Sequence, residues 1–137
     1  MNALKGVYVL IIQVTKDINV TVGALGRLLF KKGLYAYVGS AQNNLELRVK
    51  RHLRKEKTLF WHIDYLLHNE NTKIIEVFYH EASKKEECAI ANKLSKKGES
   101  ARGFGCSDCN CGSHLFRIND YAFLLKSKKI SQFLIKP

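Results

Sequence analysis

The sequence has very little proline and no long hydrophobic run. Its single proline is the last residue, Pro137, and large apolar residues are plentiful, so the composition excludes a collagen-like chain or a disordered basic tail. The apolar run 7–12 is far shorter than the roughly 20 residues that a membrane-spanning helix needs. With 137 residues, 46% of them hydrophobic, the chain suits one globular domain and is short for two. We therefore expect a single domain over residues 1–137 and no membrane partner.

Acidic residues are also scarce compared with basic ones. Lysine and arginine number 23 against 12 aspartates and glutamates, which gives a net charge of +11. Such an excess creates a field that attracts polyanions, among which nucleic acid, acidic lipid and acidic proteins are natural partners. No small-residue cleavage site follows the apolar run near the start, so we expect no secretory signal. These features predict a cytoplasmic protein that binds a polyanion.

Four cysteines are too few and too unevenly placed for a disulfide framework. Cys88 stands alone, whereas Cys106, Cys109 and Cys111 lie together in a glycine-containing loop that leads to His114. Thiolate and imidazole are zinc ligands, but these four fall within residues 106–114 rather than in two separated pairs. Reduced thiols in a tight loop are the alternative interpretation, and they agree with a reducing compartment.

The distribution of apolar residues predicts a sheet covered by helices. Residues 6–15 are apolar at odd and even positions, which is typical of a central strand with both faces covered. Shorter runs at 20–22 and 34–38 predict further strands of a small antiparallel sheet. The later elements expected are helices at 61–68 and 83–97 and strands at 73–79 and 115–118. The predicted fold class is α+β, with about three antiparallel strands at the centre and helices packed on them.

The most basic element is a helix that follows Asn44. Asn44 can cap this helix, and Leu45 and Val49 begin an apolar face that recurs every fourth residue. Its other faces carry cations that can neutralise several phosphates at once, unless they only keep the surface solvated. Arg48 and His52 share one side, where a guanidinium and an imidazole can meet one phosphodiester. The residues expected to bind DNA are Lys50, Arg51, Arg54, Lys55 and Lys57.

Two short motifs resemble those of a known family. Residues 6–8 read Gly-Val-Tyr and residues 37–39 read Tyr-Val-Gly, in the order of the two triplets of GIY-YIG nucleases. With the basic helix after them, the chain resembles an uncharacterised, largely archaeal branch of that superfamily over about residues 5–118, followed by a C-terminal extension. The resemblance implies a small α+β fold, metal-dependent hydrolysis of DNA, and Mg²⁺ or Mn²⁺ as the cofactor.

The resemblance also implies a role for each matching residue. Tyr8 would act as general base or orient the attacking water, and Tyr37 would support it. Arg48 would hold the scissile phosphate, and His52 would help through a hydrogen bond. The metal ligand of this superfamily is a glutamate on a later helix.

Two adjacent glutamates are candidates for that ligand. Ser83 followed by Glu86 fits a capping box, which gives Glu86 a structural task at the start of its helix. Glu87 shares a helix face with Ile90 and Leu94, so its carboxylate is expected to point toward the sheet. An inward carboxylate is costly unless it binds a cation. We therefore assign the divalent cation to Glu87 and keep Glu86 in reserve.

Several positions keep two interpretations. The late asparagine of the superfamily is not visible, and Asn110, Asn119 or His114 could replace it. Trp61 and Tyr65 could stack on a nucleobase or pack against the core. The sequence favours a metal-dependent DNA endonuclease. The alternatives are a nucleic-acid-binding module without catalysis and a zinc-stabilised interaction domain.

Overall fold

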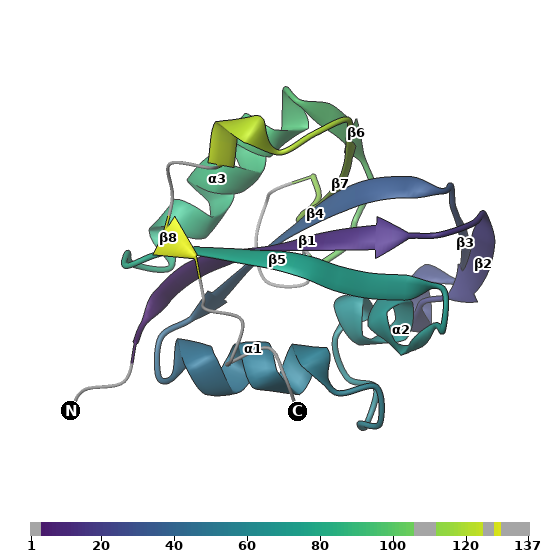
Figure 1. Ribbon diagram of the computed structural model, residues 1–137, viewed down its shortest axis with the longest axis horizontal. Coiled ribbons are helices and arrows are strands. Elements are labelled where there is room, and N and C mark those ends of the chain that lie inside the picture. Colours follow the sequence, from purple (N-terminus) through teal and green to yellow (C-terminus); the bar gives the residue numbers. More distant parts are fainter. Residues whose placement is uncertain (1–3, 106–111, 125–127, 130–137) are drawn as a thin grey trace.

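Strand β1 (Gly6–Val14) lies at the centre of an antiparallel sheet in the computed structural model, which describes residues 4–105, 112–124 and 128–129. Within these ranges the strand order is β6-β7-β4-β1-β5-β8 (Figure 1). The bounds of the other strands are Gly33–Ala41 for β4, Thr72–His80 for β5, Gly98–Ser100 for β6, Leu115–Ile118 for β7 and Lys128–Lys129 for β8. The sheet is therefore wider than the three strands expected, because short strands extend it on both sides of the central three.

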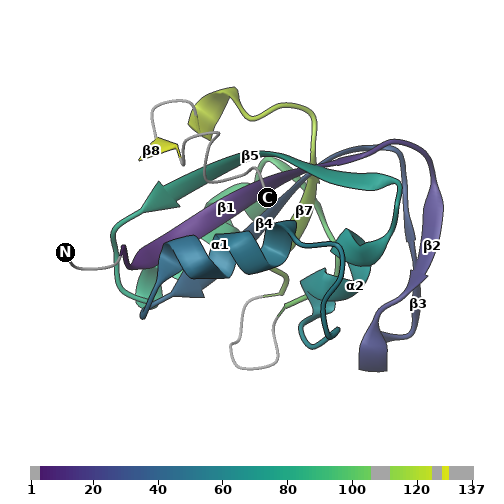
Figure 2. The ribbon, with the colours of Figure 1, turned by 60° about the horizontal axis from the view of Figure 1, so that its bottom comes forward.

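Helices cover both faces of this sheet. On one face lie α1 (Leu45–Leu53) and α2 (His62–His68), and on the other lies α3 (Lys85–Ser95), as Figures 1 and 2 show. In the part of the chain that the structure describes, no helix is long and apolar enough to cross a membrane. The structure thus confirms a mixed fold of helices packed on an antiparallel sheet.

The side chains of β1 alternate between two hydrophobic cores. Leu10 packs in the core that includes Leu45 of α1, whereas Ile11 packs in the core that includes Leu94 of α3. Every residue of β1 except Gln13 is buried. This arrangement explains why apolar residues occupy both odd and even positions of the strand, and it confirms that the strand is central.

The starts of α1 and α3 differ in how well the sequence predicts them. Asn44 caps α1 by accepting a hydrogen bond from the backbone N–H of Leu47 at 3.0 Å, as predicted. At α3 the prediction of a capping box formed by Ser83 and Glu86 is wrong. Lys84 is the N-cap residue, and no side-chain hydrogen bond caps the helix there. Ser83 instead accepts a hydrogen bond from the Glu86 N–H through its backbone carbonyl, at 3.0 Å.

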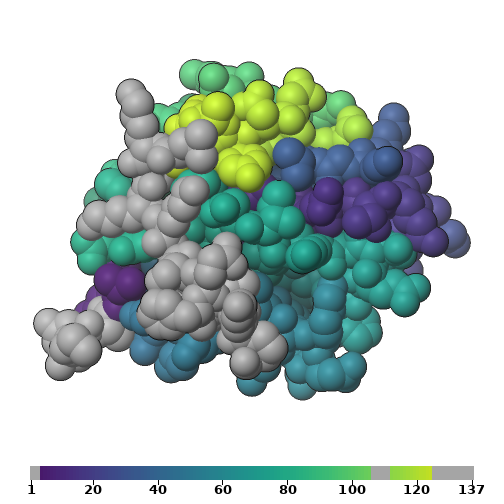
Figure 3. Space-filling model, in the orientation of Figure 1, coloured from purple at the N-terminus to yellow at the C-terminus, as the bar shows by residue number. Residues whose placement is uncertain are grey.

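A separate hairpin follows β1. It consists of β2 (Ile18–Thr21) and β3 (Arg27–Phe30), with the short 3-10 helix η1 (Gly23–Leu25) between them. The hairpin curls away from the end of the sheet in Figure 2 and forms one end of the surface in Figure 3. Phe30 anchors it, because its ring is buried and lies edge-on to the ring of Phe104, with 6.1 Å between the centroids. The sequence pattern predicts a strand near β2 but wrongly places it in the same sheet as β1 and β4, and it misses β3.

Cys88 on α3 is disulfide-bonded. Cys88 stands alone in the sequence but not in the fold, because spacing along the chain does not limit which cysteines approach one another in space. The other cysteines, Cys106, Cys109 and Cys111, lie outside the described residues.

Candidate active site

A cavity of about 570 Å³ lies beside the end of β4. Strands β1 and β4 contribute Tyr8 and Tyr37 to its lining, α1 contributes Arg48, and α3 contributes Glu87. Strand β7 pairs with β4 only as far as Tyr37, so the last residues of β4 extend past it. The structure therefore brings four of the five predicted catalytic residues to one cavity, from four different elements.

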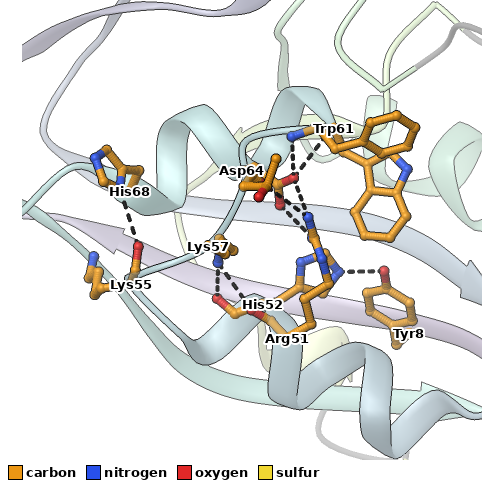
Figure 4. A network of polar contacts seen from close by, with 10 residues as sticks. Tyr8, Arg51, His52, Lys55, Lys57, Trp61, Asp64 and His68 are labelled. Atoms are coloured by element: carbon orange, nitrogen blue, oxygen red, sulfur yellow. Dashed lines mark hydrogen bonds and ion pairs between the residues drawn. The ribbon is translucent and has the colours of Figure 1, made fainter.

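His52, the fifth predicted residue, lies behind Tyr8 rather than in the cavity. Its Nε2 atom is 2.7 Å from the Tyr8 hydroxyl oxygen, and Figure 4 shows the two side chains pointing at each other. Burial, followed by the charge of Lys57, lowers the pKa of His52 to about 3. Burial also raises the pKa of Tyr8, despite a charge and a hydrogen bond from Arg48. At neutral pH the pair is therefore an uncharged imidazole that holds an uncharged phenol.

The buried, neutral His52 makes stability depend on pH. In the unfolded chain His52 has a pKa of about 6.5, so it binds a proton as the pH falls below that value. In the folded chain His52 stays neutral until the pH approaches its lower, folded-state pKa. We expect this group alone to lower the free energy of unfolding by about 3 kcal/mol between pH 7 and pH 4.

Urea denaturation of the unmodified protein and of His52→Gln at several pH values measures this effect. The variant is expected to be less stable at pH 7 but to lose less stability on acidification. His68→Gln is the matched control, because His68 is an exposed histidine on α2. An equally steep loss in His52→Gln would contradict the assignment.

Gly39 allows the Tyr8 ring to cross β4. The two residues are paired in the antiparallel register, and a Cβ atom at Gly39 would overlap both Cζ and the hydroxyl oxygen of Tyr8. The close approach of the ring, rather than an unusual backbone angle, therefore requires glycine at the end of the Tyr-Val-Gly motif.

Gly39→Ala is expected to displace the Tyr8 phenol from His52. Overpacking of this kind costs about 1–3 kcal/mol of unfolding free energy. Gly112→Ala serves as the control, because a Cβ atom there meets nothing within 4 Å, and we expect a change below about 0.5 kcal/mol. Thermal unfolding of both variants measures the difference. Equal stability of the two variants would show that the Tyr8 ring moves aside without cost.

Arg48 presents its guanidinium to the cavity from α1. One nitrogen donates to the backbone carbonyl of Ser40 at 3.0 Å, and the guanidinium carbon lies 4.6 Å from the centre of the Trp61 ring. Burial raises the pKa of Tyr8, and the positive charge of Arg48 opposes this larger effect. A guanidinium carries five N–H donors in a planar fork, so it can make these contacts and still bind a phosphate oxygen.

Glu87 and Glu86 point to different places. Glu87 is buried in the cavity, and its Oε1 atom lies 3.4 Å from Nδ1 of His114. Glu86 is exposed and borders a second cavity, formed by β1, β5 and α3 on the other side of the sheet. The helix periodicity that separates the two residues in the sequence thus agrees with their placement.

The donor set fits a divalent cation that is shared with a substrate. Glu87 is the one carboxylate among the described residues that line the cavity. Mg²⁺ usually keeps several waters and binds one or two carboxylates together with substrate phosphates. Within the described ranges, no group of three or more His, Cys, Asp and Glu side chains forms a metal cage. Glu87 is therefore the described residue of the cavity that could serve as a ligand of such an ion.

A family model matches nearly all of the chain. The family described as domain of unknown function DUF123 matches residues 7–133. The chain belongs to this family. No curated protein and no solved structure matches it. The family description names no activity, so the residues of the cavity are the basis for a proposal on the chemistry of this DUF123 chain.

Of the four predicted zinc ligands of this DUF123 chain, only His114 lies among the described residues. Its imidazole is buried in the cavity next to Glu87. Of the candidates for the late asparagine, Asn119 is exposed and does not line the cavity, and Asn110 lies outside the described residues. His114 is therefore the candidate that the structure brings to the other site residues.

Three of the five cations predicted to bind DNA have partners inside the fold. Arg51 forms a two-pronged ion pair with Asp64, at 2.8 and 2.9 Å (Figure 4). The Lys55 ammonium donates to the backbone carbonyls of residues 67, 69 and 72, and the Lys57 ammonium to those of residues 51 and 52. These contacts give the three side chains structural tasks that composition does not reveal. Lys50 and Arg54 are exposed on and beside α1, where a polyanion can reach them.

The sequence did not single out two further cavity residues as site residues. The His62 Nδ1 atom accepts a hydrogen bond from the backbone N–H of Gly105 at 2.8 Å, and burial lowers the pKa of this imidazole. Phe60 lines the same cavity, although its side chain is largely exposed. The signal that points to both is the aromatic run of residues 60–62 directly before α2.

Proposed function

We propose that this DUF123 chain is a metal-dependent DNA endonuclease that hydrolyses phosphodiester bonds and uses the residue arrangement of GIY-YIG nucleases. The observation that carries the proposal is the meeting of Tyr8, Tyr37, Arg48 and Glu87 at one cavity. Hydrolysis needs a positioned water, a cationic clamp and a metal ligand around a single phosphate. A module that only binds DNA has no use for a buried carboxylate in the same cavity as its arginine, because that carboxylate repels phosphate unless a cation lies between them.

Each residue would have one task. Arg48 would hold the scissile phosphate and stabilise the charge that develops on it. Tyr8, which is a phenol at neutral pH because burial raises its pKa, would orient the attacking water, and His52 would fix its hydroxyl. Tyr37 would support this arrangement from β4. Glu87 would hold Mg²⁺ or Mn²⁺, which when bound stabilises negative charge on the leaving oxygen.

The test is incubation of the purified chain with flap, branched and plain duplex DNA, in Mg²⁺, in Mn²⁺ and in a chelator. We expect cleavage of at least one structure that the chelator abolishes. Binding should also weaken steeply with salt, because the excess of basic groups releases counterions from the DNA. Tight binding without cleavage in any divalent ion would favour the non-catalytic module. A flat salt dependence would remove the nucleic-acid hypothesis.

A further inference from the structure

Phe60 stands out from the protein at the edge of the cavity. Its side chain is 74% exposed, the highest fraction among the large hydrophobic residues that stand out from the described surface. It also lines the cavity that holds Arg48 and Glu87. A large exposed aromatic ring on the lining of a candidate phosphate site can stack on a planar group of the ligand that enters the site.

Hydrogen bonds to a buried carboxylate fix the backbone at Phe60. The Phe60 and Trp61 N–H groups both donate to Oδ2 of Asp64 at 2.9 Å, and Arg51 clamps the same carboxylate (Figure 4). Asp64 itself is fully buried. The exposed ring therefore sits on a pre-organised support, which reduces the conformational entropy lost when a ligand binds.

The neighbouring aromatic rings of Trp61 and Tyr65 are partly covered by protein. The guanidinium groups of Arg48 and Arg51 lie over the Trp61 ring, 4.6 and 4.3 Å from its centre. Tyr65 packs against the hydrophobic core on the α2 side of the sheet. The base-stacking role considered for these two residues therefore falls more naturally to Phe60.

We propose that Phe60 stacks on an unpaired nucleobase of the DNA strand whose phosphate enters the cavity. This inference rests on the proposed function, because it takes DNA as the ligand. Inside a duplex, the neighbouring base pairs cover both faces of every base, so a protruding ring can stack only on a base that is unpaired or at an end. The substrate class is therefore DNA with an unpaired nucleotide beside the scissile bond.

The test measures binding by the full chain in a chelator, so that no cleavage interferes. One probe is a duplex with a short single-stranded tail that contains 2-aminopurine, whose fluorescence reports stacking. The other probe carries the same 2-aminopurine paired within the duplex. Phe60→Ala is expected to weaken binding of the tailed DNA about tenfold or more and to remove the fluorescence change. Binding of the plain duplex should change less than about twofold.

Two further variants sharpen the result. Phe60→Tyr should restore most of the binding, because it keeps the aromatic face. Leu47→Ala is the matched control, because Leu47 is also a hydrophobic residue on the surface, 61% exposed on α1, and does not line the cavity. If Phe60→Ala weakens binding of tailed and plain DNA equally, or weakens neither, the inference is overturned. The exposed ring would then suit a protein partner better.

The same variants separate this inference from the nuclease proposal. Cleavage in Mg²⁺ that does not depend on Phe60 would leave the nuclease standing and reject stacking. If tailed DNA binds in a Phe60-dependent way but is never cleaved, the stacking inference stands and the nuclease proposal is rejected.

Discussion

Replacing Glu87 with glutamine is expected to lower the rate of DNA cleavage by about 10³-fold or more, while DNA affinity in a chelator does not fall. Glutamine keeps the size and polarity of the side chain, including an oxygen able to face His114, but removes the charge that would hold the cation. In the proposed mechanism Glu87 would hold a cation that stabilises negative charge on the leaving oxygen, so the substitution would affect the transition state more than the bound ground state.

Two variants make this result specific. Glu86→Gln changes the exposed neighbour that borders the other cavity, and it is expected to cleave DNA normally. Arg48→Ala should impair both binding and cleavage, because its guanidinium would contact the phosphate before and during the reaction. Cleavage rates in Mg²⁺ and affinities in a chelator measure the two effects separately. Cleavage that survives in Glu87→Gln but disappears in Glu86→Gln would exchange the two roles.

The parts of the fold that the sequence predicts are those that periodicity controls locally. Alternation in β1 shows that both of its faces are covered, because side chains at odd and even positions enter different cores. In α3, the spacing of Glu87 from Ile90 and Leu94 identifies the inward carboxylate by the same geometry. Burial on a helix or strand is a property of position within the element, so one sequence is enough to find it.

The parts that the sequence does not predict depend on which segments meet in space. Lys55 and Lys57 count in the sequence as basic residues that follow a basic helix, and the structure adds that their ammonium groups donate to backbone carbonyls. Charge counts cannot show this, because the carbonyls that Lys55 meets lie at the end of α2 and the start of β5, and those that Lys57 meets lie near the end of α1. The short strands β6 and β8 are a similar case, since pairing with a neighbour creates them and their own residues carry no pattern.

Replacing Asp64 with asparagine is expected to cause the largest loss of stability, about 3–5 kcal/mol of unfolding free energy. The buried carboxylate accepts hydrogen bonds from both guanidinium nitrogens of Arg51 and from the N–H groups of Phe60 and Trp61. Asparagine removes the charge and turns an NH₂ group toward these donors, which leaves the Arg51 charge without its partner in a partly buried site. The same change should loosen the support of Phe60.

Thermal and urea unfolding measure the Asp64→Asn effect, with a fall in Tm of roughly 10 °C or more. The matched control is Glu99→Gln, because Glu99 pairs with Arg117 at 3.8 Å on the surface, where an ion pair contributes about 0–1 kcal/mol. Burial raises the pKa of Asp64, but hydrogen bonds from Arg51 and the backbone outweigh it and lower the pKa overall. Its stabilising effect is therefore complete above the unfolded pKa of about 3.9 and is lost as the pH falls through the lower folded pKa. If Asp64→Asn and Glu99→Gln lower the free energy of unfolding equally, burial adds nothing to the stabilising effect of the Arg51–Asp64 ion pair.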